Sequence, residues 1–172
     1  SRNTPTSRMK NPDDLRQAKS VALKCLSYRN RSANEVRERL VKKGFSLPIV
    51  QATLDYLKKL NYINDEHFAL SWGQSRTQTK KLGKQRIKQE LLAKGLEPEM
   101  VASAIKHIYY EVDELQLARD CAKKKLAGMR KIDVNKKRSR LVQFLARKGF
   151  NSATAYSILQ QLLPSDANED IP

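Results

Sequence analysis

The chain has 172 residues, of which 34 are Lys or Arg and 18 are Asp or Glu, so its formal net charge at pH 7 is +16. This charge is larger than solubility requires and indicates a polyanionic partner, with nucleic acid as the first candidate. No apolar run approaches the roughly 18 residues that cross a bilayer, so a membrane protein is not expected.

The chain begins with a polar and basic stretch, residues 1–12, that shows no periodicity and is expected to be a flexible arm. From about 13 to 29, apolar and small residues recur at three- and four-residue steps, which predicts a helix with one buried stripe. Ser32 and Glu35 have the spacing of a capping box, in which each residue satisfies a backbone N–H of the other. They predict the start of a second helix, which extends over about 33–43.

Gly44 is expected to end the second helix in a left-handed conformation, and Ser46 with Pro48 starts a third helix. The same apolar positions and terminal glycine recur at offsets of 51 and 105 residues, where Gly95 and Gly149 take the place of Gly44. Three-helix units of this size bury little core alone, so neighbouring repeats are expected to pack together. We therefore predict an all-α protein of three tandem three-helix repeats that form an elongated, curved array. The predicted divisions are a flexible basic arm at 1–12, repeats at 13–62, 63–111 and 112–163, the last with a longer first loop, and an acidic frayed tail at 164–172.

The sequence carries no pattern typical of a catalytic or metal site. His67 and His107 have no ligand partners at suitable spacing, and the motifs of zinc proteases, P-loop proteins and serine hydrolases do not occur. We expect no catalysis, no metal and no cofactor. Cys25 and Cys121 are expected to be small buried residues in a reducing compartment, which predicts a cytoplasmic protein.

Basic residues concentrate in three runs, each at or near the second helix of a repeat. Residues 29–43 carry six Lys or Arg against two Glu, residues 74–94 seven against one, and residues 119–148 twelve against two. Such runs can neutralise phosphates, although any single residue could instead be a solvated charge or part of an intrahelical pair. The candidate contact residues are Arg37, Arg39, Lys42 and Lys43; Lys80, Lys81, Lys84, Arg86 and Lys88; and Arg138, Arg140, Arg147 and Lys148.

Two other kinds of nucleic-acid binding are less well supported by the sequence. The second and third helices of each repeat resemble a helix-turn-helix, but the third helices begin with SLPIVQ, EPEMVA and SATAYS, which are poor in residues that read base edges. Contact with the phosphate backbone is therefore favoured over sequence-specific reading. Tyrosines such as Tyr109 and Tyr110 could stack on bases, but along the sequence they are not interleaved with the basic runs.

Three phrases of the sequence carry a family resemblance: LNYINDEHFALSW (60–72), SRTQTKKLGKQRIKQELLAKGL (75–96) and RLVQFLARKGF (140–150). Together they resemble the RecX family of bacterial regulators. Two positions depart from the family pattern: Asn61 stands where Gly is frequent, and His67 where Arg is frequent, which removes a permanent charge. The matching residues of the first two phrases are Tyr62, Ile63, Asp65 and Phe68, followed by Gly83, Arg86, Ile87, Glu90, Leu91, Lys94 and Gly95.

The resemblance implies a non-enzymatic modulator that binds the RecA recombinase filament on DNA, along the helical groove of the filament. It would inhibit or disassemble the filament and so damp recombination, ATP hydrolysis and co-protease activity. The implied partners are RecA and single- and double-stranded DNA with little sequence specificity, and the protein is expected to be a monomer without membrane contact. The alternatives are a general DNA-binding module that acts by competition for DNA, and a scaffold associated with RNA or the ribosome.

Overall fold

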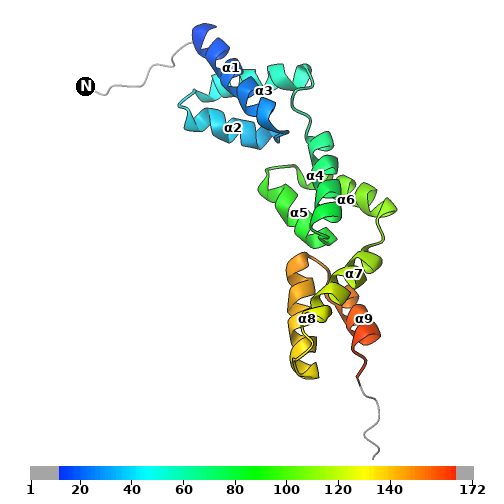
Figure 1. Ribbon diagram of the computed structural model, residues 1–172. Helices are drawn as coiled ribbons and strands as arrows, with labels where there is room; N and C mark the ends of the chain where they lie inside the picture. Colours follow the sequence, from blue (N-terminus) through cyan, green and yellow to red (C-terminus); the bar gives the residue numbers. More distant parts are fainter. Residues whose placement is uncertain (1–11, 166–172) are drawn as a thin grey trace, which may run out of the picture. The chain divides into compact units, whose positions relative to one another are not determined.

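In the computed structural model, residues 12–165 are described, and within them all regular secondary structure is helical. Of the predicted arm (1–12) and the predicted tail (164–172), residues 1–11 and 166–172 lie outside the described residues, while Pro12 is the first residue of a helix rather than of an arm. Figure 1 shows the helices in chain order. No helix among residues 12–165 is both long enough and apolar enough to cross a membrane. The helices are α1 (Pro12–Tyr28), α2 (Ala33–Lys42), α3 (Leu47–Lys59), α4 (Asp65–Thr79), α5 (Lys84–Ala93), α6 (Pro98–Glu111), α7 (Glu114–Ala127), α8 (Val134–Lys148) and α9 (Ser152–Leu162).

The predicted helix signals of the first repeat are confirmed. Ser32 is the N-cap of α2, its hydroxyl accepts from Glu35 N, and Glu35 in return accepts from Ser32 N, which completes the capping box. Gly44, Gly95 and Gly149 follow the second helix of each repeat with φ values of +90°, +78° and +94°. These values lie in the left-handed region that glycine adopts without steric cost, so one local device ends the second helix in all three repeats.

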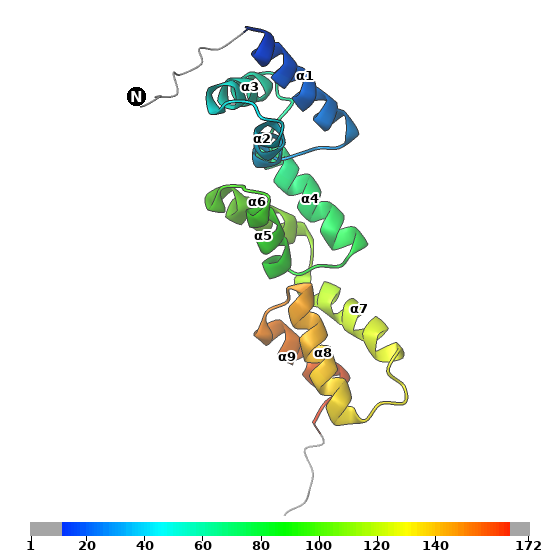
Figure 2. The same cartoon turned by 90° about the vertical axis from the view of Figure 1, so that its left-hand side faces the viewer.

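The described residues form two compact units. The first contains the residues up to Phe68 together with Lys94–Leu96, and the second contains Ala69–Ala93 and the residues from Glu97 onward. Helix α4 begins in the first unit and continues in the second. The three-helix arrangement of α1, α2 and α3 is seen in both views of the ribbon (Figures 1 and 2).

The core of the first unit is built by one stripe from each of its three helices. Ala18 and Ala22 of α1 are completely buried, and their small side chains let α1 approach α2 and α3 closely. Thr53 is buried as well, and its hydroxyl donates to Ile49 O at 2.8 Å. The remaining core side chains are Val36, Leu40, Ile49, Val50, Leu54, Leu57 and Ile63.

The second unit contains the cores of the second and third repeats. In the second repeat, Ile87 of α5 and Val101 of α6 are fully buried. Gly73 of α4 leaves room for the side chain of Ile108, because a Cβ on residue 73 would lie 2.1 Å from Ile108 Cδ1. In the third, the core comes from all of α7, α8 and α9, with Phe150 buried directly after Gly149. Most positions of the apolar stripes predicted from the sequence are confirmed as buried; Leu15, Leu26, Ile105 and Leu162 are half-buried instead.

The start of α5 and the end of α8 are joined through backbone hydrogen bonds. Gly83 N donates to Lys148 O at 2.8 Å, and Gln85 N donates to Gly149 O at 3.1 Å. These N–H groups and carbonyls have no partner within their own helices, so the joint satisfies both helix ends. A Cβ on Gly83 would lie 2.6 Å from Gly149 C and O, and therefore only glycine permits this approach.

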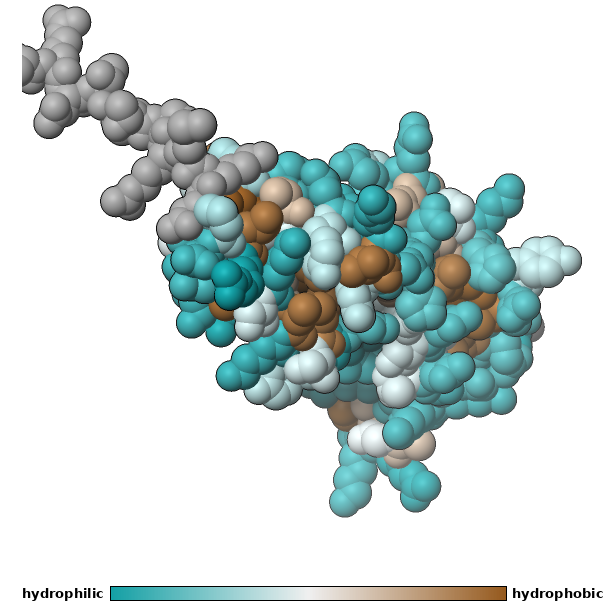
Figure 3. Space-filling model, turned by 90° about the horizontal axis from the view of Figure 1, so that it is seen from above, coloured by the Kyte–Doolittle hydropathy of each residue, from teal (hydrophilic) through white to brown (hydrophobic). Residues whose placement is uncertain are grey.

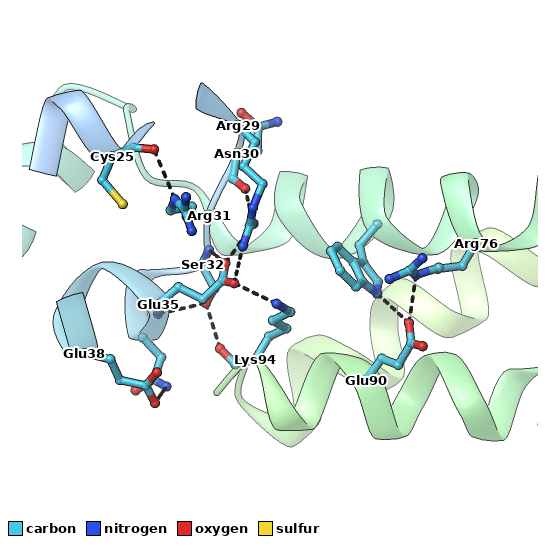
Figure 4. Close-up of polar contacts among 12 residues, drawn as sticks. Cys25, Arg29, Asn30, Arg31, Ser32, Glu35, Glu38, Arg76, Glu90 and Lys94 are labelled. Carbon is cyan, nitrogen blue, oxygen red and sulfur yellow. Dashed lines mark hydrogen bonds and ion pairs between the residues drawn. The ribbon is translucent and has the colours of Figure 1, made fainter. Parts of the chain in front are cut away.

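A comparable contact occurs in the first unit at the start of α2. Ser32 Oγ donates to Lys94 O at 2.7 Å, and Lys94 Nζ lies 2.7 Å from Glu35 Oε1 (Figure 4). The carboxylate of Glu35 also accepts from Arg29 Nη2 at 2.7 Å. Burial alone would raise the pKa of Glu35, but hydrogen bonds from Arg29, Lys94 and Ser32 N outweigh it and lower the pKa to about 2.

Replacement of Glu35 by Gln is expected to lower the free energy of unfolding by about 2 kcal/mol at pH 7, because hydrogen bonds to a charged group are worth about 1.5–3 kcal/mol. The folded-state pKa lies below the ordinary value of 4.5, so the stabilisation is present above pH 4.5 and is lost as the pH falls toward about 2. Urea unfolding of the variant and the unmodified chain at several pH values measures this difference.

Glu38→Gln is the matched control for this experiment. Glu38 is exposed and accepts one hydrogen bond, from Asn34 Nδ2 at 3.0 Å. Its replacement is expected to change the free energy of unfolding by less than about 0.5 kcal/mol at every pH. A Glu35→Gln effect that stays constant from pH 7 to pH 2 would contradict the proposed role of the carboxylate charge.

Candidate nucleic-acid interface

The first basic surface is a groove of about 770 Å³ between α1 and α2, here called the α1–α2 groove. Cys25 lies in it and is half-buried, so the prediction of a buried Cys25 is wrong, whereas the prediction for Cys121 is confirmed. Cys25 of α1 lines this solvent-open groove, whereas Cys121 of α7 belongs to the core that α7 forms with α8 and α9. Five of the lining residues are basic: Lys24, Arg31, Arg39, Lys42 and Lys43.

The positive charge of the α1–α2 groove is only partly compensated. Glu35 and Glu38 also line it, but Glu35 is already hydrogen-bonded to Arg29 and Lys94. Within residues 12–165, the side chains of Arg39, Lys42 and Lys43 form no ion pair. Their charges are therefore not neutralised by an ion pair among these residues, and their contact with an anionic partner stays a prediction.

A second basic groove, of about 320 Å³, lies between the start of α5 and the end of α8 and is here called the α5–α8 groove. It brings Lys80 and Arg86 of the second basic run next to Arg147 and Lys148 of the third. Lys148 Nζ donates to Lys80 O at 2.7 Å, which holds the two runs together. The sequence predicts all four as contact residues, but not that they share one surface.

The one acidic residue of the α5–α8 groove has partners of its own. Glu90 Oε2 accepts from Trp72 Nε1 at 2.9 Å. The same oxygen accepts from Arg76 Nε at 2.9 Å (Figure 4). Its other oxygen lies 3.5 Å from Arg86 Nε. The negative charge of Glu90 is shared with Arg76 and Arg86, and one of its oxygens also accepts from Trp72. This carboxylate therefore offsets little of the positive charge of Lys80, Arg147 and Lys148.

The other predicted contact residues are dispersed. Arg37 is not among the residues that line the α1–α2 groove, and its Nη2 donates to Gln51 Oε1 at 3.2 Å. Arg138 donates to Leu163 O, at the opposite end of α8 from Arg147. Lys81 is exposed in a left-handed conformation with φ of +54°, and Arg140 is exposed on α8. The remaining two, Lys84 and Lys88, line a third groove between α5 and α6.

Reasoning from the sequence did not include some residues of these grooves among the candidate contacts, or did not place them beside the basic runs. Lys24 and Arg31 lie outside the second helix, where the prediction concentrates the charge, yet both line the α1–α2 groove. Lys106, Tyr109 and Tyr110 line the groove between α5 and α6. Their three- and four-residue spacing on α6 is a signal that could have placed them on one face.

In the face shown in Figure 3, hydrophilic residues predominate and hydrophobic residues appear between them in patches. Among the described residues no three His, Cys, Asp or Glu side chains are placed to hold a metal ion. Fold and surface thus define a class: a helical tandem-repeat protein whose basic residues gather in solvent-open grooves.

Comparison with known proteins identifies the family within this class. Three family models match in order: "RecX, first three-helix domain" at residues 18–57, "RecX, second three-helix domain" at 64–105 and "RecX, third three-helix domain" at 111–159. These matches cover well over half of the chain. The protein belongs to the RecX family.

Individual relatives agree with this assignment. The chain is 31% identical to "Regulatory protein RecX" of Amycolatopsis mediterranei (strain U-32), over 92% of this chain and 90% of the relative. It is 34% identical to the protein of the same name from Mycolicibacterium smegmatis, over 87% of this chain and 81% of the relative. The crystal structure of RecX from Lactobacillus salivarius matches with a TM-score of 0.77 and 25% identity, covering 88% of this chain and 98% of that one.

Proposed function

We propose that this protein regulates the RecA recombinase by binding the RecA–DNA filament along its helical groove and inhibiting or disassembling it. The observation that carries the proposal is the ordered match of all three RecX domains, together with relatives named as regulatory proteins. The regulation acts through binding and requires no catalysis by this chain. Recombination, ATP hydrolysis and co-protease activity of the filament are expected to fall together.

The basic grooves support this proposal physically. A filament on DNA presents phosphates at regular spacing, and cations that neutralise them release condensed counterions, which favours binding. The α1–α2 groove and the α5–α8 groove belong to different units, so one chain carries two such surfaces. Two linked surfaces bind more tightly than either alone when both reach the filament at once.

The deciding experiment measures RecA ATP hydrolysis on single-stranded DNA while this protein is added well below the RecA concentration. A filament regulator is expected to inhibit strongly under these conditions, because one bound molecule affects many protomers. Inhibition only at amounts that coat the DNA would contradict the proposal and favour the alternative, a general DNA-binding module that acts by competition.

Salt provides a second distinction between the two functions. Binding to bare DNA is expected to weaken steeply with salt, since the logarithm of the affinity falls by roughly 0.7–0.9 per neutralised phosphate and per decade of salt. Binding to the filament is expected to persist at salt concentrations that remove the protein from bare DNA, because the RecA surface contributes. Equal salt dependence for both would indicate that only DNA is bound.

A further inference from the structure

The third groove lies between α5 and α6 and combines lysines with tyrosines; it is here called the α5–α6 groove. It has a volume of about 510 Å³, and Lys84 and Lys88 of α5 face Lys106, Tyr109 and Tyr110 of α6 across it. Among the residues that the structure describes, no acidic side chain lines this groove. The tyrosines that seem separate from the basic runs along the sequence are therefore adjacent to them in space.

The two tyrosines of the α5–α6 groove have different environments. Tyr109 is half-buried, and its hydroxyl donates to Leu82 O at 2.7 Å, which holds the ring in place. Burial, followed by the nearby Glu114, raises the pKa of Tyr109 and keeps the hydroxyl protonated. Tyr110 is 89% exposed, so its ring faces water. A fixed ring and an exposed ring thus lie together in one groove.

The charge around these rings is available to an anion. Lys84 Nζ lies 3.4 Å from Glu114 Oε2 and 5.4 Å from the ring centre of Tyr109, so this lysine is partly engaged. Within the described part of the chain, Lys88 and Lys106 form no ion pair and are exposed. Two ammonium groups without an ion pair among these residues therefore line the same groove as the exposed ring of Tyr110.

This combination occurs in only one repeat, which distinguishes it from the shared architecture. At the offset of 51 residues, Lys106, Tyr109 and Tyr110 correspond to Asp55, Lys58 and Lys59 of the first repeat. The third repeat has Gln160, Leu163 and Pro164 at the same places. A feature needed by the three-helix fold would be expected in every copy, as the terminal glycines are.

We propose that the α5–α6 groove binds single-stranded nucleic acid, with an unpaired base stacked on Tyr110 and the adjacent phosphates at Lys88 and Lys106. Bases in a duplex are stacked on each other, whereas an unpaired base can present its face to an aromatic side chain. The inference deepens the proposed function, on which it rests, by naming the form of nucleic acid and the residues that hold it.

The test compares the affinities of variants for two oligonucleotides of equal length, oligo-dT and an abasic strand, without RecA. Tyr110→Ala is expected to weaken oligo-dT binding by about 5- to 150-fold, which corresponds to the ~1–3 kcal/mol that one stacked base contributes. It is expected to leave abasic binding unchanged, because that strand has no base to stack. Tyr156→Ala, which removes a tyrosine that is 63% exposed on α9, is the matched control and should alter neither affinity.

Lys106→Gln distinguishes phosphate contact from stacking in the same assay. It is expected to weaken binding of both strands and to reduce the slope of log affinity against log salt by about 0.7, the value for one phosphate of a single strand. Tyr110→Ala should leave that slope unchanged. If Tyr110→Ala weakens the binding of both strands equally, or of neither, the proposal of a stacking site at Tyr110 is wrong.

A measurement on the unmodified chain makes the outcome independent of any variant. Irradiation of an oligonucleotide that contains 5-iododeoxyuridine is expected to crosslink Tyr110, identified by peptide mapping, and a crosslink only elsewhere would overturn the proposal. If Tyr110→Ala reduces inhibition of RecA but not oligo-dT binding, the groove contacts protein and the inference fails. If oligo-dT binding behaves as expected but RecA is not inhibited, the filament proposal fails instead.

Discussion

Replacement of both Lys80 and Arg147 by Glu is expected to weaken binding to the RecA filament by about 100-fold or more and so to remove substoichiometric inhibition. Both side chains line the α5–α8 groove, although they lie in different basic runs. Reversal turns two attractions for phosphate or acidic groups into repulsions, and such like-charge contacts cost several kcal/mol. The measurement is RecA ATP hydrolysis on single-stranded DNA over a range of variant concentrations.

These two positions are chosen because their side chains carry no structural contact within residues 12–165, apart from lining the groove. Arg86 and Lys148, in contrast, bond to Glu90 and to Lys80 O, so their replacement would also disturb the joint between α5 and α8. The fold of the double variant is therefore expected to be intact, which circular dichroism and thermal unfolding check.

Lys58→Glu with Lys59→Glu provides the matched control, since it makes the same change in net charge on exposed residues of α3. This variant is expected to keep most of the inhibition, with a small loss from the reduced long-range attraction. Equal loss in both double variants would show that total charge alone determines binding, and the α5–α8 groove would not be a contact surface.

Gly149→Ala is expected to lower the free energy of unfolding by about 3 kcal/mol, whereas Gly44→Ala lowers it by about 1 kcal/mol. Both glycines are left-handed, with φ of +94° and +90°, so an alanine pays a similar conformational cost of about 1–2 kcal/mol at either position. Only Gly149 is crowded, because its Cβ would lie 2.3 Å from Arg86 N and Cβ, while nothing lies within 4 Å at Gly44. The additional overpacking costs about 1–3 kcal/mol.

Urea unfolding of the two variants measures this difference directly, and Gly44→Ala is the control for the conformational cost. The backbone cannot simply shift at Gly149, because Gln85 N is bonded to its carbonyl and Gly83 N to Lys148 O. The Gly149 variant is also expected to lose inhibition of RecA in part, since Arg86 and Lys148 are held at this joint. Equal destabilisation by both variants would mean that the backbone between α5 and α8 moves apart to accept the Cβ of residue 149 without a loss of folding free energy.

Much of the fold could be predicted from the sequence because the signals concerned are local. The Ser32–Glu35 capping box and the terminal glycines act within a few residues of their own helix, so short stretches of sequence suffice to locate them. Asn61 is another example: its φ of +59° lies in the left-handed region, which Asn enters more readily than most residues. The apolar stripes follow helix geometry in the same way.

The grooves could not be predicted, because each depends on residues that are far apart in the chain. The α5–α8 groove requires Gly83 and Gly149 to meet, and their contact is a matter of packing between repeats rather than of helix periodicity. The middle basic run is divided for a similar reason: Arg86 points to α8, while Lys84 and Lys88 point to α6.

By itself, the sequence determined the helices, their ends, the three tandem repeats and the excess of positive charge, since each of these arises within one helix or from composition. Only the tertiary structure decided which cations act together and where a tyrosine joins them. Tyr110 shares a groove with Lys88 because α5 and α6 pack side by side around Ile87 and Val101. A binding surface is a property of neighbouring elements, and the buried contacts between those elements determine which exposed side chains meet.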